Sequence, residues 1–437
     1  MKTNVLGGVV NMRRSAVLGV LGWCLWAAPA AANSLDDLLR ASLATHPALV
    51  ASEARVAASA ANVGLSRAPW WPQVGLNGQT ARTTSVSQAQ NTVQPFNLSQ
   101  GGINVRQQLY DFDRTRFEVD VAIANQDLAT FQARQQAVDI AFQIRRAYIL
   151  VLQQEALLER ARARLNAATT LTRQAQAFYA AGKRPKLDVL RAEAARARSL
   201  AEQVDAQQAL SIARADLRWS CGGKTLPAQT LSWPITAPWL LKLVKTGNPN
   251  WMPRHPSYRL FQGRLVLQKA REASASRSAW PEISADINYG LRTRDDEISQ
   301  NWFTGLSVNA PIFTGFAETR RTEAAKWDYQ AAIAAMEAEL ARLQNEAQRA
   351  IATYQGAEAR LPAVHVALAS AEEGLRMAQA RYQAGVGSLV ELNDAEIFLN
   401  AARQEVVRAQ AARYLALADC LRAWGLTGIN QPNEEAS

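Results

Sequence analysis

The chain has 437 residues, of which 48% are hydrophobic and 20% are charged; 48 Lys and Arg against 38 Asp and Glu give a formal net charge of +10. This composition excludes intrinsic disorder, because disordered chains are poor in apolar residues and rich in charge. Three cysteines and three histidines exclude a disulfide scaffold and a His- or Cys-rich metal centre, so we expect no metal or other cofactor. Acids interleave with the basic residues, so the positive charge does not predict nucleic-acid binding.

The N-terminus has the pattern of a secretory leader. Two arginines precede an apolar stretch at residues 16–28, which is too short to span a membrane as a helix. Three alanines at 30–32 provide a small-residue cleavage site, so we expect residues 1–32 to be removed. Cys24 lacks small residues before it, so we expect no lipid anchor.

Two short segments of alternating polarity follow the first predicted helix, residues 35–67, and a Trp/Pro break at 70–72. They lie within residues 73–111, where Val74 and Leu76 share one face while polar residues occupy the other. A period of two predicts half-buried strands. Their length fits tilted membrane-spanning strands, although a sheet on a soluble core explains the pattern locally just as well.

The next predicted helix is too long for an ordinary globular core. It runs from Thr115 to Ala181, which corresponds to about 100 Å at the ~1.5 Å rise of an α-helix. A turn at 182–187 leads to a second helix over 187–219, and both helices have apolar residues at coiled-coil spacing. The seam expected on the second helix consists of Leu187, Leu190, Ala194, Ala197, Ala201 and Val204.

The second half of the mature chain repeats the first. His46-Pro47 recurs as His255-Pro256 at a spacing of 209 residues, and the turn at 179–182 recurs at 382–385, a spacing of 203 residues. The change of six residues falls within the first strand hairpin and indicates an insertion in its loop, around residues 85–97, which we expect to be extracellular. This regular correspondence predicts an internal duplication.

The duplication sets the predicted organisation of the chain. Pro362 is expected to interrupt and kink the second long helix. The expected units are a leader (1–32), a first repeat (33–220), a Pro-rich equatorial linker (221–256), a second repeat (257–427) and a tail (428–437). Within the second repeat we expect a helix at 258–278, a strand hairpin at 282–313, a long helix at 317–384, a tip at 385–391 and a last helix at 389–424.

The predicted fold is mainly α with a small transmembrane β part, built from a duplicated helix–β-hairpin–long helix unit. Four strands cannot close a barrel, and open sheet edges in lipid leave backbone groups without hydrogen bonds. We therefore expect a trimer, in which three copies form a 12-stranded β-barrel in the outer membrane. The long helices of the three copies would continue this barrel as a coiled-coil cylinder in the periplasm.

With these residues identified, the chain resembles the TolC family of trimeric outer-membrane channels, which serve drug efflux and type I protein secretion. The resemblance covers residues 34–428 and depends most on residues 178–190 and 381–395. It implies a homotrimer in contact with outer-membrane lipid, a periplasmic adaptor (membrane fusion) protein, an inner-membrane ABC or proton-driven transporter, and no enzymatic activity. Whether the cargo is a small molecule or a polypeptide stays open; the absence of a lipid anchor favours the subset that includes polypeptide channels.

The resemblance also assigns roles to the two helical turns. It implies that the turns dock the adaptor and close the channel at rest. The docking residues so implied are Gly182, Lys183, Gly385, Gly387 and Ser388.

Further roles implied by the resemblance concern the entrance and its latch. Glu391 and Asp394 would form an acidic ring that favours cations, although acids also suit the first turn of any helix. Asp188 and Tyr382 match partners in the latch that holds the tips shut. The usual Arg partner would lie at Gly387 and is absent, so Lys183, Arg184 and Lys186 are candidate replacements.

Several residues and functions stay open at this stage. Cys221 and Cys420 lie near the ends of equivalent helices, and spacing alone does not decide whether they are bonded. No phosphate loop, zinc-protease motif or nucleophile elbow is present. A periplasmic coiled-coil adaptor and a scaffold without a pore are the alternative functions; neither explains the duplicated strand hairpin.

Overall fold

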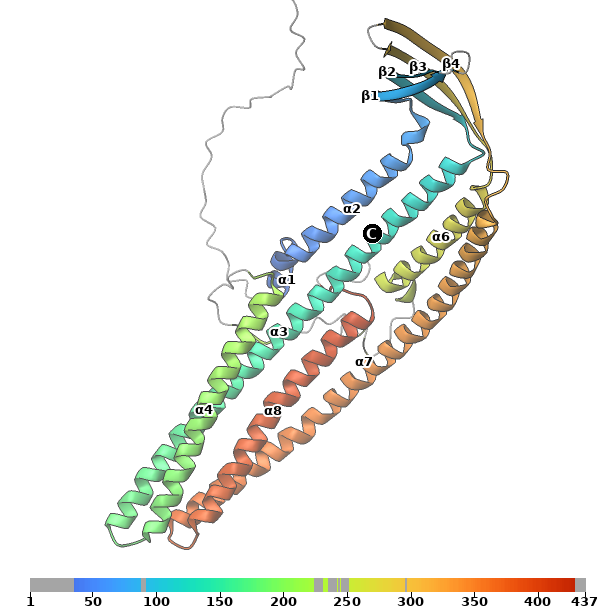
Figure 1. The fold of residues 1–437 in the computed structure, drawn as a ribbon. Helices are drawn as coiled ribbons and strands as arrows, with labels where there is room; N and C mark the ends of the chain where they lie inside the picture. Colours follow the sequence, from blue (N-terminus) through green and yellow to red (C-terminus); the bar gives the residue numbers. More distant parts are fainter. Residues whose placement is uncertain are drawn as a thin grey trace, which may run out of the picture.

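The computed structural model describes residues 35–87, 92–223, 231–234, 242, 244, 251–294 and 297–428. A long rod of helices has a four-stranded sheet at one end and two helical turns at the other (Figure 1). The expected leader, most of the linker and nearly all of the tail lie outside the described residues.

The described part of the first half of the chain contains four helices. They are α1 (Leu35–Leu43), α2 (Pro47–Ser66), α3 (Arg114–Ala180) and α4 (Lys186–Ser220), with a short 3-10 turn at Ala68–Trp70. The single helix expected over 35–67 is therefore wrong. Pro47 disfavours helical backbone at the residue before it, and His46 is extended there. The Nδ1 atom of His46 caps α2 by accepting a hydrogen bond from the Ala48 N–H at 3.2 Å.

The second half repeats this order with α6 (Pro256–Arg277), α7 (Ala317–Gln383) and α8 (Leu389–Ala423), after a 3-10 turn at Met252–Arg254. Each long helix, α3 and α7, has 67 residues. The expected interruption at Pro362 is wrong, because α7 continues through it. Tyr354 and Val364, on either side of the proline, are buried, and packing of α7 along α8 offsets the lost backbone hydrogen bond.

Two shorter helices are stacked end to end beside each long one. At the end of α4, Gly222 has φ +82°, and a Cβ atom there would lie 2.7 Å from the Pro47 ring at the start of α2. At the end of α8, Gly425 has φ +70°, and a Cβ atom would lie 2.5 Å from the Pro256 ring of α6. Only glycine fits both the backbone and the space at these two joints.

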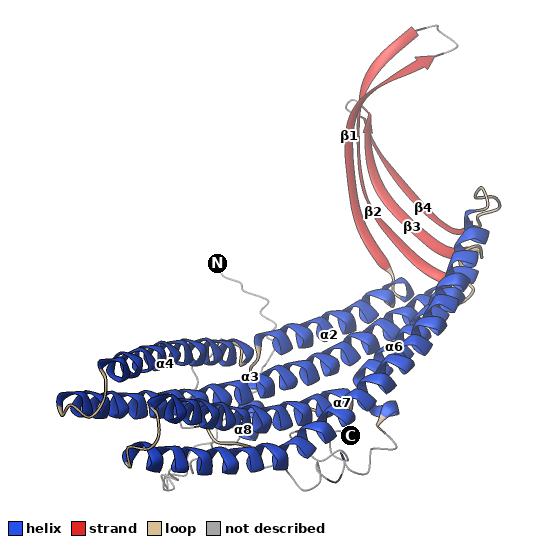
Figure 2. Ribbon diagram, turned by 90° about the horizontal axis from the view of Figure 1, so that it is seen from below, coloured by secondary structure: helices blue, strands red, loops and turns tan. Residues whose placement is uncertain are grey.

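The sheet contains β1 (Gln73–Ser87), β2 (Thr92–Tyr110), β3 (Glu282–Arg294) and β4 (Glu297–Asn309), all antiparallel and in that order. It curves away from the helical rod (Figure 2). A wide loop around 85–97 is wrong, because residues 85–87 pair with 92–94. The insertion therefore lengthens the strands of the first hairpin and leaves a narrower connection between them.

One face of this sheet is apolar and exposed. The register aligns Leu76 with Ile103, Ile103 with Tyr289, and Tyr289 with Trp302. These side chains are 48–84% exposed, and Leu306 of β4 extends the same face. Such a continuous apolar surface on a folded protein indicates contact with lipid or with another protein.

The opposite face of the sheet is polar. Arg106 of β2 pairs with Glu282 of β3 at 3.3 Å, and Gln100 donates a hydrogen bond to Gln79 at 3.2 Å. The alternation predicted from the sequence therefore extends across all four strands, although Phe303 lies on the polar face and Arg82 on the apolar one.

The buried apolar residues form separate clusters along the rod. One cluster surrounds Tyr148 in the first repeat, and its counterpart in the second repeat contains Tyr354. Cys221 belongs to the first and Cys420 to the second; both are buried and unbonded. A third cluster lies at the tips and contains Tyr382.

The seam predicted on α4 is on the wrong face for packing within one chain. Leu187, Leu190 and Val204 are 52–59% exposed. The side of α4 that packs against its own chain instead contains Ala192, Leu210 and Leu217. The predicted heptad stripe is therefore an apolar surface without a partner among the described residues of this chain.

Candidate functional site

The two helical turns lie next to each other at the end of the rod farthest from the sheet (Figure 1). One joins α3 to α4, and the other joins α7 to α8. Arg184 in the first turn donates a hydrogen bond from Nη2 to the Gly387 carbonyl in the second, at 2.9 Å. The tips are thus connected within one chain.

A glycine with positive φ ends each long helix. Gly182 has φ +69° and Gly385 has φ +81°. Beyond them, the N–H of Lys183 donates to the Phe178 carbonyl at 2.9 Å, and the N–H of Val386 donates to the Arg381 carbonyl at 3.1 Å. This is the usual geometry by which a left-handed glycine stops a helix.

Gly387 has a steric reason to be glycine. A Cβ atom at this position would lie 3.0 Å from the backbone of Arg381 and from the Tyr382 nitrogen. An arginine here would therefore require the turn to open. The residue 203 positions earlier is Arg184, so the arginine lies in the first repeat and reaches across to the second.

Tyr382 is the buried centre of the tips. The Arg184 guanidinium lies over its ring at 5.0 Å from the centroid, and the Phe178 ring lies at 6.0 Å. Burial raises the pKa of Tyr382, the charge of Asp188 raises it further, and Arg184 lowers it. The structure therefore brings Asp188, Tyr382 and Arg184 together. Within the described residues, the Tyr382 hydroxyl has no hydrogen-bond partner.

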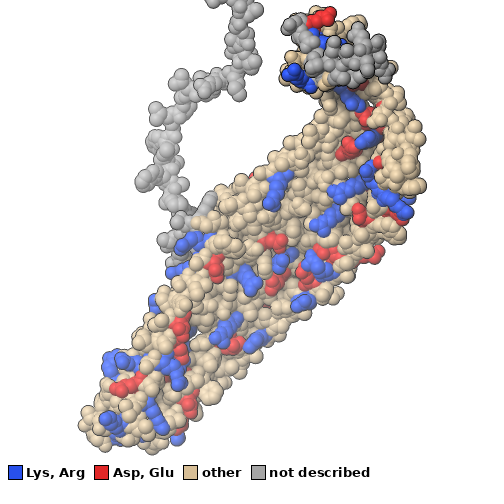
Figure 3. All heavy atoms as spheres, viewed as in Figure 1, with Lys and Arg blue, Asp and Glu red and all other residues tan. Residues whose placement is uncertain are grey.

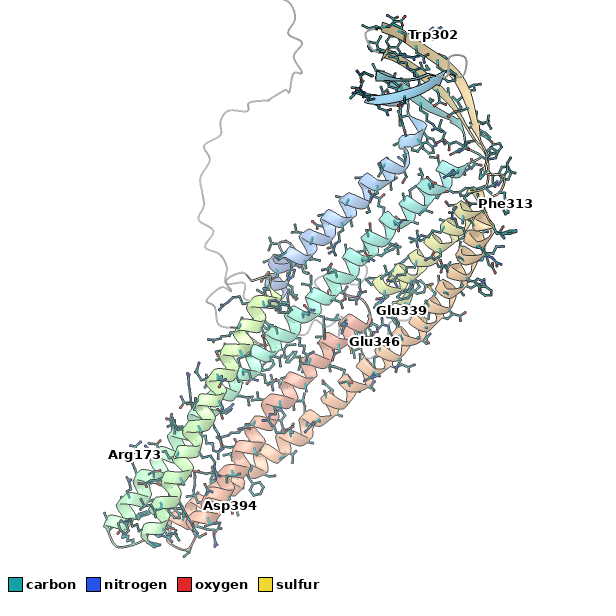
Figure 4. All side chains as sticks on the ribbon, viewed as in Figure 1. Arg173, Trp302, Phe313, Glu339, Glu346 and Asp394 are labelled. Carbon is teal, nitrogen blue, oxygen red and sulfur yellow. The ribbon has the colours of Figure 1, made fainter. Side chains whose placement is uncertain are left out.

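The two acidic residues at the start of α8 differ in their surroundings. Glu391 pairs with Arg381, with 2.9 Å between Oε1 and Nε, and its N–H donates to the Ser388 hydroxyl, which caps α8. Asp394 is exposed one turn further along α8 (Figure 4). Arg381 was missed by sequence reasoning, because its contact spans the turn.

No described helix is both long and apolar enough to cross a membrane. No group of three or more His, Cys, Asp or Glu side chains in the described ranges could hold a metal ion.

An amphipathic sheet on a long helical rod that ends in two hydrogen-bonded turns defines an outer-membrane channel protein. The chain belongs to the outer membrane efflux protein family, whose model matches residues 38–223 and 260–426. It is an outer-membrane protein with its helical part in the periplasm, and the TolC-like fold expected from the sequence is confirmed. The adaptor and scaffold alternatives do not fit this family.

Named relatives and a solved structure match almost the whole chain. Protein CyaE of Bordetella pertussis is 28% identical over 90% of this chain and 85% of its own length. Outer membrane protein TolC of Vibrio cholerae is 23% identical over 94% of both chains. The crystal structure of outer membrane protein VceC from Vibrio cholerae has a TM-score of 0.76 at 18% identity, covering 90% of this chain and 96% of that one.

Proposed function

We propose that three copies of this chain assemble into an exit duct through the outer membrane. The observation that carries the proposal is the open, amphipathic four-stranded sheet: among the described strands, β1 and β4 each pair on one side only. Three copies would supply twelve strands and leave no free edge. The apolar face would meet lipid and the polar face would line the pore.

The helices also have exposed apolar surfaces that would pair between neighbouring copies. Among the four tip-side helices, α3 packs against α4 and α8, and α7 packs against α8, so α4 and α7 are the outer members. The exposed heptad stripe on α4 and the exposed Val366 and Met377 on α7 are apolar surfaces at the two sides of one subunit. Pairing of α4 with α7 of the next copy would bury both.

The duct would operate with a periplasmic adaptor and an energised inner-membrane transporter. We propose that the turns dock the adaptor through Gly182, Lys183, Gly385, Gly387 and Ser388. The entrance would be lined by Glu391 and Asp394, and it would be held shut at rest by Asp188, Tyr382 and Arg184. We also propose that residues 1–32 direct export and are then removed. The cargo is either a secreted polypeptide or small molecules.

The test is assembly and conductance of the purified, detergent-extracted protein. We expect a trimer by light scattering, heat-modifiable migration on gels, and single-channel currents in planar bilayers. Leu190→Glu places a charge on the α4 stripe and should dissociate the trimer. Gln207→Glu, off the stripe on the same helix, should not. A stable monomer that produces no currents would refute the proposal.

The cargo can be decided in cells. A deletion strain complemented with the wild-type gene should regain either export of a secreted protein or resistance to toxic small molecules. The transporter that co-purifies after cross-linking, an ABC or a proton-driven one, provides an independent readout.

A further inference from the structure

The apolar face of the sheet has a single charged residue among the described strands. This residue is Arg82, which the register places on the same side of β1 as Leu76. The other charged residues of the four strands lie on the polar face, namely Arg106, Glu282, Asp286, Arg292, Arg294 and Glu297. Charged side chains are common along the helical rod (Figure 3), so their near-absence from this face of the sheet fits contact with lipid.

Arg82 lies one membrane span away from the end of the sheet that adjoins the helices. It follows Trp71, at that end, by eleven residues. At ~3.3 Å per residue and a tilt of ~45°, eleven residues cover about 25 Å of depth, which is the height of the apolar band of outer-membrane barrels. A lipid-facing charge costs most free energy at the bilayer midplane and little at the interface. The depth of Arg82 is therefore one at which a membrane tolerates an arginine.

The opposite edge of the sheet has the same span. Trp302 of β4 and Phe313 are also eleven residues apart, and Figure 4 shows Trp302 on the sheet and Phe313 at its junction with the helices. Trp71, Trp302 and Phe313 are 71–76% exposed, and aromatic residues mark both interfaces of a membrane-spanning barrel. Arg82 therefore occupies on β1 the level that Trp302 occupies on β4. Because the helical part lies in the periplasm, this level is the outer interface.

Hydroxyl groups and no acids surround Arg82. Its side chain is exposed, and within the described part of the chain it forms no ion pair. Thr80 and Thr84 flank it on the same face of β1, and the Thr80 Oγ1 lies 2.8 Å from the Ser99 Oγ of β2. Residues 73–105 contain no other charged residue. A guanidinium beside hydroxyl donors suits a phosphate, which it binds through paired hydrogen bonds.

We propose that Arg82, with the hydroxyls of Thr80, Thr84 and Ser99, binds a phosphate of a lipid headgroup in the outer leaflet of the membrane. The acyl chains of that lipid would lie on the apolar face of the sheet below Arg82, so the ligand is a phosphorylated lipid and not free phosphate. Each copy of the chain would supply one such site. The inference depends on the proposed function, because the depth of Arg82 is defined by a sheet that spans the membrane.

The test is native mass spectrometry of the full-length, detergent-extracted protein titrated with bisphosphorylated lipid A. We expect Arg82→Gln to weaken binding of this lipid by about tenfold, because the charge-assisted hydrogen bonds to phosphate are lost. Arg82→Lys should be intermediate, because lysine keeps the charge but lacks the planar guanidinium. Lipid A without phosphates should bind the wild type and Arg82→Gln equally weakly.

Arg292→Gln is the matched control, since it removes the same charge from the polar face of β3 and should leave binding unchanged. Equal binding of bisphosphorylated lipid A by the wild type and Arg82→Gln would overturn the proposal, and so would equal loss in Arg82→Gln and Arg292→Gln. Displacement of the lipid by inorganic phosphate at the same concentration would also overturn it, because the site would then be one for a free anion. Conductance of the wild type is recorded in parallel. Absence of currents would refute the duct, whereas currents combined with unchanged lipid binding in Arg82→Gln would refute only the lipid site.

Discussion

Removal of the Arg184 side chain should open the tips. In Arg184→Ala, the hydrogen bond to the Gly387 carbonyl and the contact with the Tyr382 ring are both lost. A hydrogen bond from a charged donor contributes about 1.5–3 kcal/mol, and a partly exposed cation–π contact about 0.5–1 kcal/mol. Because Arg184 is only partly buried, we expect a net loss of about 2 kcal/mol per copy.

This loss would shift the ratio of closed to open tips by roughly thirtyfold in each copy. The assay is single-channel recording of the purified wild type and variant in planar bilayers at one voltage and salt concentration. We expect a higher conductance or a larger open fraction in Arg184→Ala. Arg184→Lys should be intermediate, because lysine keeps the charge but lacks the planar guanidinium.

Lys183→Ala is the matched control, since it removes the same charge from the adjacent exposed residue. Light scattering first establishes that each variant has the mass of the wild-type assembly. If Arg184→Ala and Lys183→Ala gave currents equal to those of the wild type, Arg184 would not hold the tips shut. If both opened the channel equally, the charge of the turn and not the contact would be responsible.

Three further predictions concern other parts of the chain. Gly425→Ala should lower the free energy of unfolding by about 3 kcal/mol, because alanine disfavours the positive φ and its Cβ would clash with the Pro256 ring. Gly223→Ala has a positive φ but open space around it, so it should lower the free energy of unfolding by about 1 kcal/mol. Thermal melts of the two variants test this difference. Burial lowers the pKa of His255 from 6.5 to about 4, so the folded state binds fewer protons than the unfolded state between these values, and the free energy of unfolding should fall by up to about 3 kcal/mol as the pH is lowered from 6.5 to 4. His255→Asn, which keeps a cap but does not titrate in this range, should remove most of that dependence in denaturant titrations, and an unchanged pH profile would contradict the assignment. Asp394→Asn should reduce cation selectivity, measured as a reversal potential, more than Glu391→Gln does, because Arg381 already compensates Glu391; equal effects would argue against this difference.

The sequence predicts the regular elements of this fold well for physical reasons. A period of two across 73–81 and apolar residues at coiled-coil spacing over 121–152 are strong local signals, and the repeat supports the assignment by giving each element a counterpart. The predicted C-terminal ends of α3 and α7 are correct to within one residue, because Gly182 and Gly385 mark where each helix must stop.

The sequence could not show which neighbour each helix face or side chain contacts. The apolar stripe on α4 has coiled-coil spacing. Spacing alone does not show whether the partner helix belongs to the same chain. Within this chain the opposite face of α4 is the buried one. Similarly, Arg184 was one of three basic residues that could replace a missing arginine. Only the folded turns show that Arg184 contacts Tyr382 and Gly387.

The glycine–proline joints interrupt only the shorter helices of the rod, because α3 and α7 run past both joints unbroken. Midway along the rod, α4 ends against α2 and α8 ends against α6. At each of these two boundaries a glycine Cα lies against a proline ring, and the described helices share no backbone hydrogen bond across it. A small tilt of α4 and α8 therefore does not have to pass directly into α2 and α6, because only α3 and α7 run continuously between the two ends of the rod. Any movement of the tips would reach the sheet through these two continuous helices alone.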